Sequence, residues 1–233
     1  MLLETLSKHS KVSDASLNWL ALTASQRYKT YEIPKRNGGV RQINHPSRML
    51  KVVQRWIVRF LARRLEVHPS ATAYSRGSSI RKNAEYHKNS NFTLRVDFKD
   101  FFPSFEASGI AAYLAAVSRE RELDLSQQDV EFIARICSRH GRLTIGAPSS
   151  PILTNLLMYQ FDHAMSTYCS NSKQIYTRYA DDIFISTNIP GTLSDALEYL
   201  SESAIAFPFA NLKINHEKTA FLSKKYHRSI TGM

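Results

Sequence analysis

The spacing of apolar and polar residues changes along the chain, and the change predicts where helices and strands lie. In several stretches apolar residues recur at intervals of three or four positions, which is typical of an amphipathic helix. These stretches are residues 48–67, 106–118, 126–139 and 152–165, and residues 1–29 resemble a shorter helical lead-in that Ser13 or Asp14 caps. Helices should therefore make up much of the fold.

Three other stretches have the composition of strands joined by turns. Residues 31–46 carry an Asn-Gly-Gly turn signal between two strand-like runs, which predicts a β-hairpin. Residues 92–98 form an apolar run that predicts a buried strand. Residues 174–186 hold the runs IYTRY and IFIS on either side of two adjacent acids, so they predict a second hairpin with the acids at its tip. Together with the helices, these strands predict an α+β fold.

The two adjacent acids, Asp181 and Asp182, are the first candidates for chemistry. Neighbouring carboxylates repel each other unless a cation lies between them, and Mg²⁺ takes one or two protein carboxylates together with substrate phosphates. Asp97, where the strand 92–98 ends, would supply a third carboxylate. The alternative is a polar hairpin turn, because Asp is common in turns for local hydrogen-bonding reasons.

The predicted helix at residues 48–67 has two distinct stripes. Its apolar positions are Met49, Val52, Val53, Trp56, Ile57, Phe60, Leu61 and Leu65, and its cationic positions are Arg48, Lys51, Arg55, Arg59 and Arg63. The apolar stripe should face the core. The cationic stripe suits a nucleic-acid backbone, although a solvated helix face is the more common use of such charges.

Charge is concentrated in the first third of the chain. The formal net charge is +11, and residues 27–88 alone hold 15 Lys and Arg against 3 Glu, a net of +12. This distribution indicates a polyanion-binding region joined to a nearly neutral remainder. Lys35, Arg36 and Arg41 in the hairpin at 31–46 suit phosphate oxygens. General solubility, and an edge hairpin protected by its charges, are the alternatives.

Composition excludes several other classes of protein. The 233 residues are 43% hydrophobic, enough for a substantial core, but no apolar run approaches the ~20 residues of a membrane span. The first residues lack the basic start and apolar core of a signal peptide, and Cys137 and Cys169 have no CxxC spacing. We therefore expect a cytoplasmic protein without membrane contact, disulfide framework or zinc site.

Two loops have compositions that suit contact with a flat or extended ligand. Residues 68–87 mix Ser, Gly and Arg around Tyr74 and include Arg76, which suits a template strand, and a short helix should begin near Ile80. In the loop before residue 152, Gly146 exposes backbone that can lie against a base pair. An ordinary helix N-terminus explains that second loop equally well.

Several motifs, taken in order, resemble those of reverse transcriptases. Tyr179-Ala180-Asp181-Asp182 resembles the catalytic Y-x-D-D element, VDFKDFF the first catalytic motif, GAPSSPILTN the template-and-primer loop, and LKINHEKT a later palm motif. The pair Asn83 and His87 matches an N-A-x-x-H element similar to the bacterial retron branch in particular, and residues 229–232 resemble a V-T-G element. The resemblance covers about residues 27–233.

The resemblance implies a right-hand polymerase fold with fingers and palm. Residues 1–91 would form N-terminal helices and fingers, residues 92–223 the palm with a fingers-side insertion around 119–148, and residues 224–233 the start of a thumb. The palm would have an antiparallel, ferredoxin-like sheet packed on helices. Because the sequence ends at Met233, we expect most of the thumb to be missing, through either truncation or a functional short form.

The resemblance also implies roles for individual residues. Asp97, Asp181, Asp182 and the backbone carbonyl of Phe98 would hold two Mg²⁺ ions, with Mn²⁺ as a substitute, and Lys218 would protonate pyrophosphate unless it is a plain surface lysine. Phe102 would exclude a 2′-hydroxyl. The residues expected to contact the nucleotide are Lys35, Arg36, Arg41, Phe98, Phe102, Ile145, Gly146 and Tyr179, and those expected to contact RNA are Arg48, Lys51, Arg55, Arg59, Tyr74, Arg76, Asn83 and His87. Ile145 stands where many relatives have Gln.

The implied activity is RNA-directed DNA synthesis on a primer, with dNTPs as substrates. The implied partners are a template and primer RNA, such as a structured non-coding RNA, and an effector protein in antiviral defence. Two rival functions remain: a nucleic-acid-binding defence module that no longer polymerises, and an RNA-templated RNA polymerase. The three carboxylates argue against the first rival, and Phe102 at the sugar position argues against the second.

Overall fold

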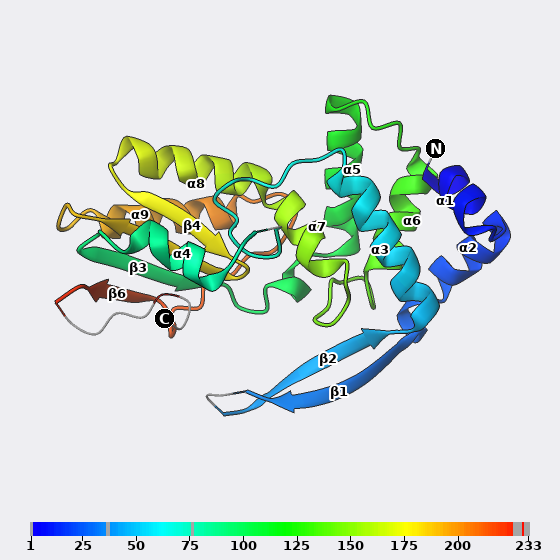
Figure 1. Ribbon diagram of the computed structural model, residues 1–233, viewed down its shortest axis with the longest axis horizontal. Helices are drawn as coiled ribbons and strands as arrows, with labels where there is room; N and C mark the ends of the chain where they lie inside the picture. Colours follow the sequence, from blue (N-terminus) through cyan, green and yellow to red (C-terminus); the bar gives the residue numbers. More distant parts are fainter. Residues whose placement is uncertain (1, 36–37, 76, 226–229, 231–233) are drawn as a thin grey trace. The chain divides into compact units, whose positions relative to one another are not determined.

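The computed structural model describes residues 2–35, 38–75, 77–225 and 230 of the chain. These residues form two compact units, Met1–Leu65 with Phe102–Thr154, and Glu66–Phe101 with Asn155–Met233. Figure 1 shows the elements of each unit. This partition differs from the expected fingers, palm and thumb ranges, which stay a functional prediction. Arg36, Arg76 and much of the expected thumb segment lie outside the described residues.

The first unit packs helices against one another beside a β-hairpin. Its helices are α1 (Leu2–Ser10), α2 (Asp14–Leu22), α3 (Arg48–Ala62), α5 (Ala107–Glu120) and α6 (Gln127–Cys137), with short 3-10 turns at Ala24–Gln26 and Phe102–Ser104. Helix α6 packs against α2, α3 and α5. Ser126 and Asp129 form a reciprocal capping box at its start, and the other carboxylate oxygen of Asp129 accepts a hydrogen bond from the backbone of Leu3 at 2.9 Å. This bond ties α1 to α6.

The predicted hairpin is present as strands β1 (Tyr28–Pro34) and β2 (Val40–Pro46), which pair antiparallel. Gly38 and Gly39 have φ angles of 85° and 75°, a region that glycine enters without steric cost. The backbone N–H of Lys35 donates to the carbonyl of Gly39 at 3.0 Å and closes the turn. Figure 1 shows the two strands as a long ribbon.

Helix α3 buries Val53, Ile57 and Leu61 as predicted, but its buried face is shifted from the predicted one. Met49 and Val52 are 41% and 55% exposed, whereas Leu50 and Gln54 are fully buried. The side chain of Gln54 donates to the backbone carbonyl of Ile136 at 2.9 Å, so a polar residue takes part in the contact with α6. The helix also ends at Ala62 instead of Val67, in a tight turn where the N–H of Arg64 bonds to the carbonyl of Leu61.

The predicted helix at 152–165 is two helices, α7 (Ser150–Leu157) and α8 (Tyr159–Asn171). They are interrupted at Met158, whose φ and ψ are −75° and 0°. The buried positions continue on both sides of the interruption, for example Leu156, Leu157 and Phe161. Because the interruption leaves this apolar spacing nearly intact, periodicity alone does not reveal it.

The second unit contains a four-stranded antiparallel sheet in the order β4-β5-β3-β6. Its strands are β3 (Phe92–Asp97), β4 (Ile175–Tyr179), β5 (Asp182–Thr187) and β6 (Ala220–Ser223), and its helices are α4 (Ile80–His87), α8 and α9 (Leu193–Ile205). The hairpin β4–β5 and the strand β3 lie where the sequence predicted them. The fold is therefore α+β with antiparallel sheets, as expected.

Helices α4 and α8 cover opposite faces of strand β4. Successive strand residues point to opposite faces. On β4, Tyr176 and Arg178 hydrogen-bond to Asp162 of α8, and Thr177 between them bonds to His87 of α4. The sheet is thus buried on both sides at this strand. None of the helices in the described part of the chain combines the length and apolar character needed to cross a membrane.

Candidate active site

Three carboxylates gather at one end of the sheet, on strands β3 and β5 and in the turn before β5. Asp97 is the last residue of β3 and pairs directly with Asp182, the first residue of β5. Asp181 lies in the turn between β4 and β5, beside Ala180, whose φ angle is 59°. The carbonyl of Asp181 accepts a hydrogen bond from the backbone of Phe98 at 3.2 Å. The predicted meeting of Asp97 with the Asp181–Asp182 pair is therefore present in the structure.

The burial and close spacing of these carboxylates shift their pKa values. Burial, followed by the charge of Asp182, raises the pKa of Asp181 to about 6. Burial also raises the pKa of Asp182, and the guanidinium of Arg95 opposes this shift. Both groups thus lie in an environment that disfavours their negative charge, and added positive charge would relieve it.

Two protein cations already bond to this cluster. Lys218 donates from Nζ to both carboxylate oxygens of Asp97, at 3.0 and 3.1 Å, and the side-chain amide of Asn215 donates to Asp97 at 3.0 Å. Arg95 lies 3.3 Å from Oδ1 of Asp182. The sequence motifs indicated Lys218 but not Arg95. Arg95 lies two residues before Asp97 and therefore on the same face of the predicted strand. This spacing is the signal that could have identified Arg95.

The donor chemistry of the cluster fits a hard divalent cation, because carboxylate and carbonyl oxygens are the ligands that Mg²⁺ prefers. Across residues 2–35, 38–75, 77–225 and 230, however, no group of three His, Cys, Asp or Glu side chains is arranged to hold a metal ion. Lys218 bonds to both carboxylate oxygens of Asp97, and Arg95 bonds to one carboxylate oxygen of Asp182. A metal would compete with both cations.

The loop that contains Ile145 and Gly146 is attached to strand β2 through backbone atoms. The N–H of Asn44 donates to the carbonyl of Ile145 at 2.8 Å. Gly146 has a φ of +103°, and a Cβ added there would lie 2.7 Å from the carbonyl oxygen of Asn44. Only glycine fits this close approach. The Ile145 side chain is half-buried, and the backbone contacts of this loop with Asn44 hold it against β2.

The other residues predicted to contact the nucleotide occupy separate places. Lys35 and Arg41 are exposed on the hairpin, and Phe102 is half-buried in the 3-10 turn Phe102–Ser104 of the first unit. Tyr179 is half-buried at the end of β4 and pairs with Asp182. Phe98 is buried and bridges to Ile214 in the second unit. The roles predicted for these residues remain predictions.

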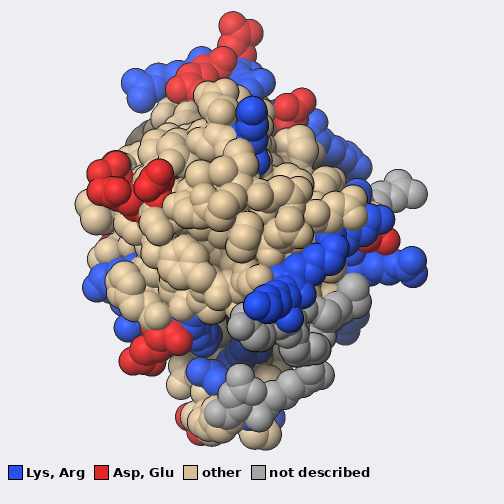
Figure 2. All heavy atoms as spheres, turned by 90° about the vertical axis from the view of Figure 1, so that its left-hand side faces the viewer, with Lys and Arg blue, Asp and Glu red and all other residues tan. Residues whose placement is uncertain are grey.

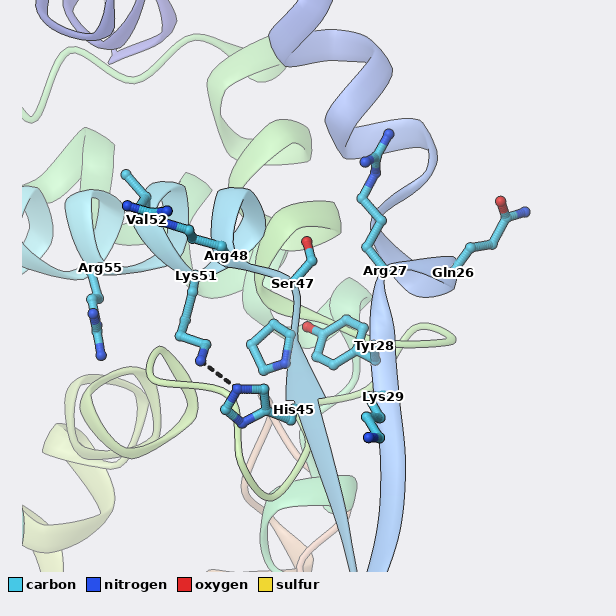
Figure 3. A pocket seen from close by; sticks show the side chains of 11 residues that line it. Gln26, Arg27, Tyr28, Lys29, His45, Ser47, Arg48, Lys51, Val52 and Arg55 are labelled. Atoms are coloured by element: carbon cyan, nitrogen blue, oxygen red, sulfur yellow. Dashed lines mark hydrogen bonds between the residues drawn. The ribbon is translucent and has the colours of Figure 1, made fainter.

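A basic cavity of about 540 Å³ lies in the first unit, between the base of the hairpin and the start of α3. Among the described residues that line it, the charged side chains are all cationic: Arg27, Lys29, Arg48, Lys51 and Arg55. Figure 3 shows Lys51 and Arg55 extending in the same direction, with Lys51 bonded to the ring of His45 at 2.5 Å. Only part of the cationic stripe of α3 therefore lines the cavity, because Arg59 is exposed but is not among the lining residues.

Charge is distributed differently on another part of the surface. Figure 2 shows a face on which most atoms are uncharged and scattered Lys and Arg lie among Asp and Glu.

Asn83 and His87 do not have the surface position that an RNA contact requires, and here the structure differs from the prediction. Both side chains are 0% exposed. The ring nitrogens of His87 bond to Ser186 and Thr177, each at 2.7 Å, and Asn83 accepts from Thr72 at 2.8 Å. The motif therefore fastens α4 to the sheet. Tyr74, in contrast, is exposed, with a φ of 62°.

Comparison with known proteins gives one consistent family. The family described as reverse transcriptase (RNA-dependent DNA polymerase) matches residues 33–233. Retron Ec83 reverse transcriptase of Escherichia coli is 34% identical over 214 residues, which cover 88% of this chain and 67% of that protein. Retron Ec86 reverse transcriptase of the same organism is 32% identical over 233 residues, which cover 99% and 70%.

Solved structures support the fold. Apo telomerase from Candida tropicalis matches with a TM-score of 0.57 at 14% identity, over 93% of this chain and 49% of the telomerase chain. This likeness concerns the fold alone, while the family assignment depends on the retron relatives. The chain belongs to the retron reverse transcriptases, a branch of the RNA-directed DNA polymerases.

Proposed function

We propose that this chain extends a primer on an RNA template with dNTPs, by phosphoryl transfer assisted by two metal ions. The observation that carries the proposal is the meeting of Asp97, Asp181 and Asp182 at one end of the sheet, in an environment that raises the pKa of Asp181 and Asp182. Such a set of oxygen ligands has a clear use in phosphoryl transfer.

The three carboxylates and the carbonyl of Phe98 would hold two Mg²⁺ ions or, in their place, Mn²⁺. When bound, the ions would stabilise charge on the primer hydroxyl and on the leaving pyrophosphate. Asp97 would then give up its bonds to Lys218 and bind a metal ion instead. In the same way, Asp182 would give up its contact with Arg95. The ammonium of Lys218, whose side chain is 56% exposed, would then give a proton to pyrophosphate.

The nucleotide would be positioned by groups from several segments. Lys35, Arg36 and Arg41 suit its triphosphate, and the ring of Phe102 would exclude a 2′-hydroxyl. Gly146, Ile145 and Tyr179 would shape the surface under the base and sugar. Phe102 is half-buried in the 3-10 turn Phe102–Ser104.

The RNA would be held through its phosphates by the basic cavity. Arg48, Lys51 and Arg55 line it together with Arg27 and Lys29, which the sequence analysis did not single out. Closely grouped cations of this kind suit the backbone of a nucleic acid, whose binding weakens as salt displaces them. Arg59, Tyr74 and Arg76 are further residues that we propose to contact RNA. A structured RNA as template and primer is the partner we infer.

The biological setting is part of the same proposal. Antiviral defence with an effector protein is the role we infer from the retron relationship. A cytoplasmic location agrees with the two cysteines, Cys137 and Cys169, which are free and buried thiols.

One assay tests the central claim. A primed RNA template is incubated with the chain, Mg²⁺ and either labelled dNTPs or labelled NTPs, with Asp181→Asn as the inactive control. Incorporation of dNTPs by the wild type alone is the expected result. Incorporation of NTPs would favour an RNA polymerase, and RNA binding without incorporation would favour a module that no longer polymerises.

A further inference from the structure

A buried ion pair lies behind the turn that carries Asp181. The guanidinium of Arg178, next to last in β4, is fully buried and donates from Nε and Nη2 to the two carboxylate oxygens of Asp162, at 2.8 and 2.7 Å. Asp162, on α8, is also fully buried, and it accepts a third bond from the hydroxyl of Tyr176 at 2.7 Å. The forked pair fixes the plane of the guanidinium.

The remaining arm of the guanidinium reaches the turn itself. Nη1 of Arg178 donates to the carbonyl of Ala180 at 3.0 Å and to the side chain of Asn155 at 3.2 Å. Asn155 is held in turn, because its amide donates to the carbonyl of Ala73 at 2.8 Å. The guanidinium therefore connects α8 to the backbone between Tyr179 and Asp181.

The backbone conformation of Ala180 is one that neighbouring groups must stabilise. Its φ of 59° lies in the left-handed region, which residues with a Cβ rarely enter unless their surroundings impose it. The carbonyl that accepts from Arg178 belongs to the peptide that joins Ala180 to Asp181. The orientation of this peptide therefore determines the position of the Asp181 side chain.

Stability alone is a weak explanation for this arrangement. Removing two charges from water costs about as much as their attraction returns, and apolar replacements of buried ion pairs are often neutral or stabilising. A charged fork does what an apolar side chain cannot, because it fixes the direction of a particular carbonyl. The pair therefore fixes the direction of the Ala180 carbonyl rather than adding stability to the fold.

We propose that Arg178 is a positioning residue that holds the Ala180 carbonyl and thereby places the Asp181 and Asp182 carboxylates for cation binding. Asp162 and Asn155 aim the guanidinium. The inference rests on the proposed function of the carboxylates and adds to it the element that orients them.

The test compares Arg178→Lys with Thr187→Val. Lysine keeps the charge, but its single ammonium cannot span Asp162 and Ala180 at once. Thr187 is buried at the other end of β5, where its hydroxyl donates to the carbonyl of Lys173 at 3.1 Å and accepts from the backbone of Ile189 at 3.2 Å, so Thr187→Val removes hydrogen bonds of a buried residue away from the carboxylates. Three quantities are measured: Mn²⁺ binding in the presence of a dNTP by electron paramagnetic resonance, the single-turnover rate constant, and the melting temperature.

Arg178→Lys is expected to weaken Mn²⁺ binding about fivefold and to lower the single-turnover rate constant at least about tenfold, because small misplacements of reacting groups are costly. Thr187→Val should change both by less than about twofold at a similar melting temperature. If Arg178 had a purely structural role, Arg178→Lys would lower only the folded fraction. The Mn²⁺ affinity and the rate constant of the folded enzyme would then equal those of Thr187→Val, and this result would overturn the proposal.

A second variant carries the test if Arg178→Lys does not fold. Asn155→Ala leaves the pair of Arg178 and Asp162 intact but removes the acceptor that steers Nη1, so we expect Mn²⁺ binding to weaken about threefold. Unchanged binding in that variant would overturn the proposal.

The proposed function fails separately from the positioning role. If the wild type binds Mn²⁺ through Asp181 but incorporates no dNTP, polymerisation is rejected while the binding comparison still decides the role of Arg178. If Asp181→Asn leaves Mn²⁺ binding unchanged, the carboxylate site is not a cation site, and both proposals fall.

Discussion

Lys218 and Asp97 form a bidentate ion pair, with Nζ at 3.0 and 3.1 Å from the two carboxylate oxygens. The carboxylate is buried and the ammonium is half exposed, so the lysine reaches into the site from the solvent side. The pair gives Lys218 two effects: it satisfies the Asp97 charge without a metal, and it holds an ammonium group, which we propose as the proton donor, beside that carboxylate.

Replacement of Lys218 by Ala should separate these two effects. We expect kcat for dNTP incorporation to fall about 100-fold through loss of the proton donor, while Mn²⁺ binding is unchanged or tighter because the competing ammonium is gone. Lys213→Ala, an exposed lysine of the same segment, is the matched control. Equal rates for the two variants would show that Lys218 is an ordinary surface lysine.

Replacing Asp181 or Asp182 by Asn should abolish incorporation, by at least about 1000-fold, because each carboxylate contributes to stabilising charge in the transition state. The melting temperature of Asp181→Asn should not fall, since burial already disfavours the negative charge at this position. RNA binding should also stay the same. Asp100→Asn, in which an exposed acid near Asp97 is changed, should retain activity, and full activity of Asp181→Asn would reject the metal assignment.

Phe102 should control the choice of sugar. Phe102→Val is expected to raise the use of ribonucleotides relative to deoxynucleotides by at least about tenfold, because a smaller side chain admits the 2′-hydroxyl. The measurement is the ratio of kcat/KM for a dNTP and the matching NTP. Phe105→Leu, at a fully buried aromatic in the same region, controls for general loosening. An unmoved ratio would make Phe102 a packing residue.

The basic cavity predicts how RNA affinity depends on salt. Arg55→Ala or Lys51→Ala should weaken RNA binding and lower the slope of log affinity against log salt by about 1, as expected when one phosphate contact is lost. Arg63→Ala changes an exposed cation that follows the same helix but does not line the cavity, so its slope should match the wild type. Identical slopes for all three variants would contradict a phosphate site in the cavity.

Gly146→Ala should destabilise the first unit more than a matched glycine does. The new Cβ would meet the Asn44 carbonyl at 2.7 Å, and the φ of +103° is unfavourable for alanine, so we expect a loss of at least about 3 kcal/mol in the free energy of unfolding. Gly141→Ala has a φ of +75° but open space around it, and should cost about 1 kcal/mol. Urea unfolding measures both. Equal losses would mean that the loop moves away from β2.

Much of the local structure was determined by the sequence. The hairpin around Gly38 and Gly39 and the hairpin that carries Asp181 were both predicted correctly, because turn residues and strand-forming runs act over a few positions. The helices α3, α5 and α6 were predicted with small errors at their ends, for the same reason. The same patterns placed three carboxylates, Asp97, Asp181 and Asp182, at strand ends, and these lie together as expected.

Only the tertiary structure decided which side chains meet across long separations. Lys218 bonds to a carboxylate 121 positions earlier, and His87 bonds to a serine 99 positions later, in the core rather than at the RNA surface where its motif had placed it. The burial of Arg178 depends on Asp162, which the sequence pattern gave no reason to single out. Local spacing specifies the face of a helix or strand, but the partner of a buried polar group depends on how distant segments pack, and that information is not contained in any short stretch of sequence.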